Sequence, residues 1–528
     1  AVALTEQMRA RFTLGEEVQQ RYLERRLEPY HGLIALHVAA GQPEQAFRVM
    51  ERIKGRVLLD VLRGGRIPAP STLRPAQLQR EQQLHAELTS LNAQVRREME
   101  RQHPDEVRLA ELRTRQAEAR RAWDTFRTGL YAAHPELRVI RAEIPAATPA
   151  EGAAALPGPR AAALAYAVGE EQTWLVVLRP GRAGRSPGLK VLALPVGREA
   201  LARRVEAFRQ QLANPSRELP AEGRALHDLL VQPAARELAG VDRLIVSPDG
   251  PLWDLPFQAL QRPSGRHLLE DFALSMAPSL TVLREMRRDG RVRIASAAET
   301  FRSPEPAVPL LAVGDPVIGE AAVRRTGLIR RGGRMGRLPE SAREARALGT
   351  LYGAASRVYV GEKATEARVR AEARDARVLH FATHGMLINS SPLYSHILLT
   401  PSPGSGDDGI LEAWEIMQTP LHAQVAVLSA CETARGRAAA GEGVVGLTWA
   451  LFVAGCRTAV VSQWEVESRS TGQLMVEFHR RLRQAMARPG GHSNAAAALR
   501  GAALAVRKDP RFRHAFFWAG FTVMGEGD

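Results

Sequence analysis

The sequence predicts an α/β fold in which helices cover a mainly parallel sheet, preceded by an all-α region. From about residue 140 onward, short apolar strands alternate with helical stretches, which is typical of parallel sheets. Two of these apolar segments end in a histidine and a cysteine, at the edge of the sheet where a crevice is expected. The residues before about 135 instead repeat apolar side chains at helical spacing.

The strands and helices of the α/β part can be placed by their apolar runs and flanking turn residues. In residues 136–304 we expect strands at 162–168, 173–178 and 244–247 and helices at 198–212 and 223–238. In residues 305–528 we expect strands at 310–314, 357–360, 378–383, 425–429, 458–464 and 516–524. Only this second half has its own histidine and cysteine pair, so we expect the first half to be non-catalytic.

Residues 1–66 are predicted to form paired helices. Apolar residues around Leu33 and Ile34, the glycine at Gly41, and the spacing of Ala46 and Met50 resemble the end of a tetratricopeptide-type repeat. One or two such units are too few for a stable solenoid. We therefore expect them either to dock on the following segment or to cap a longer array.

Residues 67–135 are predicted to form a long helical hairpin. Apolar residues recur three or four positions apart at 84, 88, 91, 95 and 99, and a second stripe runs through 109, 112, 119, 123 and 126. Pro104 interrupts the pattern, and Asp105 can cap the second helix. We expect the stripe to pack within the chain, with a partner-binding coiled coil as the alternative.

Composition excludes several classes of protein. A chain of 528 residues exceeds what one hydrophobic core supports, so two or more domains are expected. No apolar run reaches transmembrane length, and no phosphate-binding glycine loop occurs. The two cysteines, Cys431 and Cys456, offer no disulfide framework and no metal-ligand pattern. We therefore expect a cytoplasmic protein without a metal or other cofactor, with Cys456 in the core.

The chain begins at Ala1 with no recognisable signal peptide, so we expect a processed or trimmed chain. Its net charge of +15 would suit a nucleic-acid partner, and a basic groove is the alternative to be tested. The arginines, however, are spread along the chain and interleaved with glutamates, as on solvated helix faces. We therefore expect no direct nucleic-acid binding and no membrane association.

The histidine and the cysteine are the strongest indication of chemistry. His384 follows the strand expected at 378–383, and Cys431 follows the strand expected at 425–429. Although 47 positions separate them (431 − 384), the carboxyl ends of parallel strands meet in one crevice. A cysteine nucleophile and its base need this proximity. A turn after Cys431 into a helix expected at 443–452 would also lower the thiol pKa. A structural role in the core is the alternative for each residue alone.

Several further segments occur in a recognisable order. These are Ser-Pro-Asp-Gly at 247–250, the run at 255–260, His-Gly at 384–385, Leu-Ser-Ala-Cys-Glu-Thr-Ala at 428–434 with glycines at 436, 441, 443 and 446, Val-Ser-Gln-Trp at 461–464, and Phe-Trp-Ala-Gly-Phe at 517–521. Together they resemble the signature of CHAT-domain proteins, which are caspase-like cysteine peptidases of clan CD. The resemblance spans roughly residues 140–528 and implies a caspase-like fold with a non-catalytic and a catalytic half.

The resemblance implies a cysteine endopeptidase acting on a protein substrate. Cys431 would be the nucleophile and His384 the base, and the backbone N–H groups of Gly385 and Cys431 would hold the oxyanion. His380 is expected to give structural support. Family members with repeats often belong to bacterial defence or signalling systems, where some act with a CRISPR effector and others cut gasdermin-like pore formers. We therefore expect a regulatory protein partner and a latent enzyme.

Two other functions stay open at this stage. A catalytically silent caspase-like scaffold would bind partners through the helical region, although the intact His384 and Cys431 argue against it. An amidohydrolase or transferase could use the same cysteine. The loop at 401–409 is predicted to be flexible, and could be a substrate-gating loop, a processing site or a plain surface insertion.

The substrate pocket is expected to be formed by residues close to the cysteine and to Trp464. The set is Ser429, Glu432, Ser462, Trp464, Glu465 and Glu467, and the substrate is expected to pair as an added strand along 461–466. The resemblance implies that an acidic residue two before the cysteine, or four after the tryptophan, selects a basic side chain. Ser429 and Ser468 occupy these positions, so we expect cleavage after an uncharged residue. Glu465 or Glu467 could act as a counter-charge and select arginine instead.

Overall fold

The computed structural model describes most of the α/β part and two portions of the helical region. The described residues are 27–55, 80, 84, 87, 91, 94, 98, 105–133, 145–181, 186–214, 221–288, 308–319, 322, 336–387, 394–402, 407–429, 438–439, 443–444, 446–464, 467–488 and 493–528. The chain divides into two compact units. Residues 1–22 and 59–144 form the hairpin unit, and residues 23–58 and 145–528 form the sheet unit.

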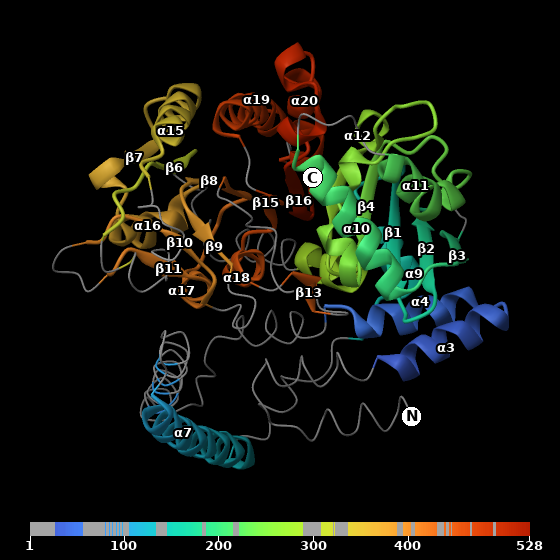
Figure 1. Cartoon of the computed structure of the whole chain (residues 1–528), viewed down its shortest axis with the longest axis horizontal. Coiled ribbons are helices and arrows are strands. Elements are labelled where there is room, and N and C mark those ends of the chain that lie inside the picture. Colours follow the sequence, from blue (N-terminus) through green and yellow to red (C-terminus); the bar gives the residue numbers. More distant parts are fainter. Residues whose placement is uncertain are drawn as a thin grey trace, which may run out of the picture. The chain divides into compact units, whose positions relative to one another are not determined.

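The sheet unit is built on an 11-stranded sheet (Figure 1). In sheet order its strands are β3 (Gly188–Leu194), β2 (Thr173–Arg179), β1 (Ala161–Val168), β4 (Arg243–Ser247), β5 (Ala273–Met276), β16 (Phe521–Gly525), β15 (Thr458–Ser462), β12 (Val425–Leu428), β8 (Val378–Ala382), β6 (Leu311–Gly314) and β7 (Arg357–Val360). Among these strands only the pairs β1–β2, β2–β3 and β15–β16 are antiparallel. The predicted mainly parallel sheet is therefore confirmed.

Helices cover both faces of the part of this sheet formed by residues 305–528, which keeps the name catalytic half from the sequence prediction. Right-handed crossovers place α15 (Pro339–Tyr352) on one face, because the chain then moves from β6 outward to β7. The chain returns from β7 through β8, β12 and β15, so α16 (Glu366–Glu372), α17 (Ala413–Gln418) and α18 (Leu447–Ala454) cover the other face (Figure 1). Both faces being covered explains why β8 and β12 consist entirely of buried residues.

The non-catalytic half is less parallel than expected. Strand β3 and strand β5 were not anticipated, and β3 joins β2 in an antiparallel hairpin at the edge of the sheet. Helix α10 spans Arg198–Leu212, as predicted, whereas α11 ends at Leu230 rather than at 238. The predicted last strand at 516–524 begins only at Phe521, because Ala515–Phe517 form a 3₁₀ turn. Likewise, α18 begins at Leu447 rather than 443.

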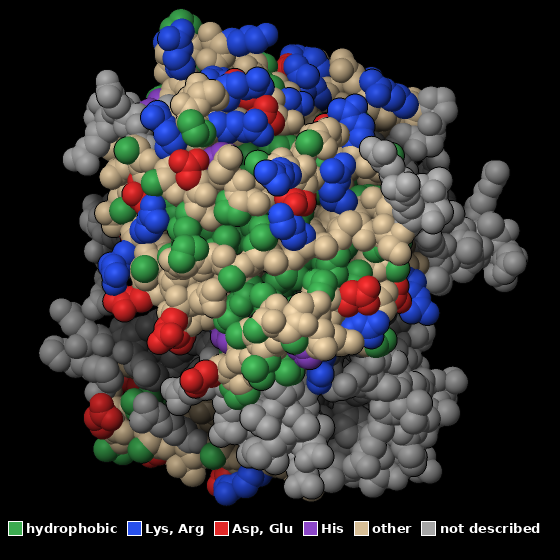
Figure 2. Space-filling view, turned by 90° about the vertical axis from the view of Figure 1, so that its right-hand side faces the viewer, with side chains coloured by type: hydrophobic (Ala, Val, Ile, Leu, Met, Phe, Trp, Pro, Cys, Tyr) green, Lys and Arg blue, Asp and Glu red, His purple; other side chains and the backbone are tan. Residues whose placement is uncertain are grey.

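The edge strand β3 carries a charged lysine that discourages pairing with another sheet. The Lys190 ammonium lies 2.7 Å from a carboxylate oxygen of Glu237. Figure 2 shows this side of the molecule, where apolar side chains gather across the middle and most lysines and arginines lie toward one end. A lysine on an exposed edge is a common protection against strand addition.

The predicted pair of N-terminal helices packs on the non-catalytic half. Helices α3 (Glu28–Ala39) and α4 (Pro43–Ile53) form an antiparallel pair, and Tyr30, Ile34, Phe47 and Met50 are buried. The His31 ring stacks on Trp174 of β2 with 5.7 Å between ring centroids. The described pair is therefore docked on the sheet unit, a docking site that neither of the two alternatives considered above had named.

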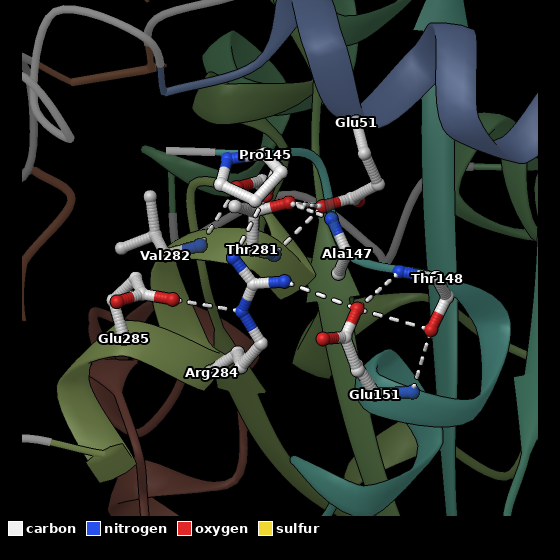
Figure 3. Close-up of polar contacts among 10 residues, drawn as sticks. Glu51, Pro145, Ala147, Thr148, Glu151, Thr281, Val282, Arg284 and Glu285 are labelled. Carbon is white, nitrogen blue, oxygen red and sulfur yellow. Dashed lines mark hydrogen bonds and ion pairs between the residues drawn. The ribbon is translucent and has the colours of Figure 1, made fainter. Parts of the chain in front are cut away.

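A buried carboxylate fixes α4 to the helical segment at 280–288 (Figure 3). Glu51, which is 2% exposed, accepts hydrogen bonds from the backbone N–H and the hydroxyl of Thr281, both at 2.7 Å, and from the Leu280 N–H at 3.3 Å. An anion at a helix N-terminus satisfies N–H groups that have no partner within the helix. The Thr281 hydroxyl in turn accepts the N–H of Ala147 at 3.0 Å.

A buried lysine follows at the end of α4. The Lys54 ammonium donates to the carbonyl and hydroxyl oxygens of Ser247, both at 2.9 Å, and to the Pro248 carbonyl at 3.3 Å. Burial lowers the pKa of this ammonium to about 8. Glu51 thus links the helix pair to the 280–288 helix that follows β5, and Lys54 links it to the end of β4.

The hairpin unit contains the long helix α7 (Glu106–Ala133). Asp105 caps it as predicted, accepting the N–H groups of Val107 and Arg108 at 3.0 and 3.1 Å. Leu109, Leu112 and Ala119 of this helix are buried and form one apolar cluster with Leu91. No helix within the described residues is long and apolar enough to span a membrane.

We predict that Glu51→Gln loosens the helix pair selectively. An amide offers one acceptor oxygen in place of two, so buried N–H groups on the 280–288 helix lose their partner, at a cost of about 1–3 kcal/mol. Hydrogen exchange should accelerate in α4 and at residues 280–288. Glu44→Gln, at an exposed position of the same helix, is the control and should leave exchange unchanged. Equal exchange in both variants would contradict the capping role.

Candidate active site

The pairing of β8 with β12 carries the two predicted catalytic positions. The strands are parallel, with Phe381 opposite Leu428, and the N–H of Ser429 continues the ladder by donating to the Phe381 carbonyl at 2.8 Å. His384 lies three residues after Phe381 (384 − 381), and Cys431 lies three residues after Leu428 (431 − 428). Cys431 itself, with Glu432, lies outside the described residues. Equal offsets from one register pair favour neighbouring positions at the strand ends.

The backbone around His384 is fixed by a small second sheet. Strand β9 (Gly385–Met386) pairs antiparallel with β10 (His396–Leu398), which pairs with β11 (Ile410–Glu412). The His384 carbonyl accepts the Leu398 N–H at 2.9 Å, and the Thr383 hydroxyl donates to the Leu398 carbonyl. The histidine therefore emerges from a backbone held on one side by β10.

This pairing also orients the N–H of Gly385, which is a predicted oxyanion donor. Bonded and non-bonded residue pairs alternate along an antiparallel ladder. His384 and Leu398 form a bonded pair, so Gly385 and Ile397 form a non-bonded pair. The Gly385 N–H consequently points away from β10 and is not used by this ladder, which a predicted oxyanion donor requires.

The imidazole of His384 contacts a backbone carbonyl that the sequence did not indicate. Its Nε2 lies 3.1 Å from the carbonyl oxygen of Gly336, and this ring is partly exposed. A carbonyl can only accept, so the ring carries a proton on Nε2, and Nδ1 is free of it in the neutral form. Because Gly336 lies 48 positions before the histidine, no local pattern could have revealed the contact.

His380 is part of a buried polar chain within the sheet unit. Its Nδ1 lies 3.0 Å from Nε2 of His479 on α19 (Ser468–Met486), whose Nδ1 lies 3.1 Å from the Tyr352 hydroxyl. Its Nε2 lies 2.7 Å from the Glu344 carboxylate, a close electrostatic contact that is poorly aligned as a hydrogen bond. Burial holds the pKa of His479 well below its usual range, and neighbouring His380 adds to this effect.

The described pocket candidates differ in how accessible they are. Ser429 is partly exposed at the end of β12, whereas Ser462 is fully buried in β15. Trp464 is buried and its indole N–H donates to the Phe516 carbonyl at 3.3 Å. Glu465 lies outside the described residues.

Glu467 already has a structural task. Its carboxylate caps α19 by accepting the N–H groups of Ser470 at 2.6 Å and Arg469 at 3.0 Å. Burial acts to raise the pKa of this carboxyl, but the two N–H groups outweigh burial and the pKa is lowered. A carboxylate engaged in this way is a poor counter-charge for a substrate cation.

The expectation of an added strand along 461–466 needs a correction at its start. Val461 pairs with Leu428 on one side and Thr522 on the other, and Ser462 pairs with Phe521. An interior strand has no free edge, so the N-terminal part of this segment cannot take up a substrate strand.

Gln258 holds the pocket strand to the non-catalytic half. Its amide N–H₂ group lies 2.9 Å from the Gln463 amide oxygen and 2.7 and 3.1 Å from the carbonyls of Ala519 and Phe521. All these groups are buried within the sheet unit, so the position of the residue before Trp464 depends on this amide. The motif at 255–260 gives no indication of this contact, because Gln463 lies 205 positions away from Gln258 in the chain.

An acidic cluster lies behind the small sheet. Arg370 of α16 contacts carboxylates of Glu415, Glu366 and Asp407 at 3.1, 3.5 and 3.5 Å. The Gly409 N–H donates to Glu366 at 2.9 Å, so the described end of the loop at 401–409 is tied to α16. Within the described part of the chain, no group of three or more histidine, cysteine, aspartate or glutamate side chains could hold a metal ion.

Comparison with known families identifies the class of protein. The profile of the CHAT domain matches residues 220–526, which is more than half of the chain, and this chain belongs to the CHAT domain family. The described catalytic half, with its parallel β6, β8, β12 and β15, lies within the matched range.

Two curated relatives are the tetratricopeptide repeat protein 28 of Mus musculus and that of Homo sapiens. Each is 26% identical over 341 residues, covering 57% of this chain and 13% of the relative. The chain thus spans about an eighth of the length of these relatives. Two solved separase–securin complexes of Saccharomyces cerevisiae are similar at 10% identity, with TM-scores of 0.42 and 0.41. They cover 71% and 97% of this chain and 30% and 44% of those chains.

We predict that Glu415 makes this region less stable as the pH rises. Burial raises the pKa of its carboxyl from 4.5 to about 7. A raised pKa favours the protonated native form, so the associated stability is present below pH 4.5 and is lost as the pH rises through 7. Glu415→Gln should therefore raise the melting temperature relative to wild type more at pH 8 than at pH 4.5.

Thermal unfolding at the two pH values measures this difference, and the exposed Glu171→Gln is the control. A Glu415→Gln effect that is the same at both pH values would show that the carboxyl does not titrate in this range.

Proposed function

We propose that this chain is a cysteine endopeptidase that cleaves a protein substrate with Cys431 as nucleophile and His384 as base. One observation carries the proposal: Phe381 of β8 lies directly opposite Leu428 of β12, and in the sequence His384 and Cys431 each follow their member of this pair by three positions. Side chains at the carboxyl ends of adjacent parallel strands share a crevice. Membership of the CHAT family supports the same assignment.

The reaction proceeds by acyl transfer. The Cys431 thiol gives its proton to His384, and the sulfur attacks the scissile carbonyl carbon to form a C–S bond. The resulting oxyanion accepts hydrogen bonds from the N–H groups of Gly385 and Cys431. Collapse to the thioester breaks the C–N bond, and the leaving amine takes the proton from His384. Water then hydrolyses the thioester and restores the thiol.

The Gly336 carbonyl supports this reaction by fixing the proton on the histidine. With Nε2–H directed at Gly336, the neutral ring presents an unprotonated Nδ1, which can accept the thiol proton. The imidazolium that forms keeps the same hydrogen bond, which stabilises it. The Gly336 carbonyl thus takes the place that a carboxylate partner has in a catalytic triad.

The proposal includes regulation by a protein partner. A partner that engages the docked helices α3 and α4 could act on the non-catalytic half through Glu51 and Lys54. We propose that turnover of polypeptides is low until this partner is present, as in a defence or signalling system of the cytoplasm. The reactivity of Cys431 toward a small reagent does not require the substrate groove to be ordered.

We predict that Cys431→Ala and His384→Ala each abolish proteolysis without loss of folding, because neither removes a large buried side chain. A small thiol-reactive electrophile should label the wild type and the control Cys456→Ala. Cys456 is fully buried, and burial raises the pKa of its thiol to about 12, so it should not react. Labelling that is independent of both Cys431 and His384 would leave only the scaffold function.

We further predict that cleavage follows an uncharged residue. A buried arginine or lysine side chain needs a carboxylate, and Ser429 is neutral while Glu467 caps α19. Cleavage of a peptide library, read out by mass spectrometry at the residue before the cut, tests this. Dominant cleavage after arginine that is lost in Glu465→Gln would identify Glu465 as the counter-charge and contradict the prediction.

A further inference from the structure

One aspartate holds the segment that presents the Gly336 carbonyl to His384. Asp315 follows β6 directly, and its carboxylate takes up the fork of Arg337, with Oδ1 accepting from Nε at 3.0 Å and Oδ2 from a terminal nitrogen at 2.6 Å. Oδ1 also accepts the N–H of Leu338 at 2.6 Å. Gly336 is the residue immediately before these two donors.

The backbone of Asp315 is tied to the same loop. Its N–H donates to the Ser341 hydroxyl at 2.8 Å, and that hydroxyl donates to the Leu338 carbonyl at 2.8 Å. Asp315 has a φ of +46°, a left-handed conformation that aspartate and asparagine tolerate better than most residues. Asp315, which is 5% exposed, therefore joins the chain that leaves β6 to the chain that enters α15. We call this set of contacts the clasp.

We propose that Asp315 is a positioning residue that holds the Gly336 carbonyl against Nε2 of His384, through Arg337 and Leu338. This inference rests on the proposed function of His384. Without the clasp, the loop would be free to withdraw the carbonyl, and the imidazole could rotate or exchange its proton between the two nitrogens. A misplacement of about 1 Å in such a contact can cost as much as about 100-fold in rate.

The charges around the clasp are compatible with this role. The hydrogen bonds from Arg337 hold the pKa of Asp315 below its ordinary value, against the opposing effect of burial, so the carboxyl stays ionised near neutral pH. Arg346 and the Leu338 N–H act in the same direction, while Glu362 lies near Arg337.

The test variant is Asp315→Asn in the full chain, because asparagine keeps the size and tolerates the left-handed backbone. It removes the charge and one acceptor oxygen, so it cannot serve both the Arg337 fork and the Leu338 N–H. Asp509→Asn is a matched control, since Asp509 likewise accepts Nε and a terminal nitrogen of Arg511, at 3.1 and 2.7 Å, and the Arg511 N–H at 3.0 Å.

The readout is the rate at which iodoacetamide alkylates Cys431, followed by mass spectrometry at pH 6.5 and at pH 9.5. At pH 6.5 the thiolate depends on the histidine, whereas at pH 9.5 a thiol ionises without help, since a free cysteine has a pKa of about 8.5. We expect Asp315→Asn to react at least about 10-fold more slowly than wild type at pH 6.5 and within about 2-fold of it at pH 9.5. At pH 6.5 the alkylation rate of Arg337→Gln should lie between those of wild type and Asp315→Asn, and the rate of Asp509→Asn should match that of wild type.

His384→Ala distinguishes the two levels of the argument. If wild type and His384→Ala react equally at pH 6.5, the histidine does not activate the cysteine, and the proposed function is overturned. If His384→Ala is slow but Asp315→Asn matches wild type, the function stands and the positioning role of Asp315 fails. A slow Asp315→Asn at both pH values would indicate a general structural defect and would also overturn the positioning role.

Discussion

The parallel pairing of β8 with β12 is the constraint on which the rest of the site depends. Successive side chains of a strand point to opposite faces, so a slip of one residue would turn every side chain to the other face of the sheet. Both strands consist of buried residues, so each side chain would then have to fit a differently packed surface. The pairing of Phe381 with Leu428 is therefore strongly specified by packing. The residues at the strand ends are positioned by this pairing, because Ser429 follows Leu428 by one position and His384 follows Phe381 by three.

The catalytic half does not stand alone, because one sheet runs through both halves. Strand β16 pairs with β15 on one side and with β5 of the non-catalytic half on the other. Met276 of β5 lies opposite Met524 of β16, and the buried amide of Gln258 reinforces this junction with contacts to Gln463, Ala519 and Phe521. Burying an amide is costly unless its hydrogen-bonding groups find partners, and the Gln258 N–H₂ group has three acceptor oxygens at this seam.

The sequence was a good guide to elements and a poor guide to the contacts between them. Strands β7, β8 and β12 and helix α10 were predicted within a residue or so, because their apolar runs and periodicities are local signals. The aromatic run at 516–518 suggested a strand, yet the 3₁₀ turn at Ala515–Phe517 lets the Phe516 carbonyl accept the Trp464 N–H. Asp315, Gly336 and Gln258 were not predicted as site components, because each acts on a residue far away in the chain.

Helix α15 connects these long-range contacts. Its first residue, Pro339, follows the segment clasped by Asp315, and that segment carries the carbonyl facing His384. More than one turn after Pro339, Glu344 of this helix contacts His380 in the middle of β8. Tyr352, at the end of the helix, contacts His479 of α19. The same helix therefore touches the histidine strand both in its interior and, through the clasp, at its end. Since buried polar groups must keep their partners, a displacement of α15 would break several of these contacts at once. The position of His384 is thus determined by α15 as much as by the strand that bears it.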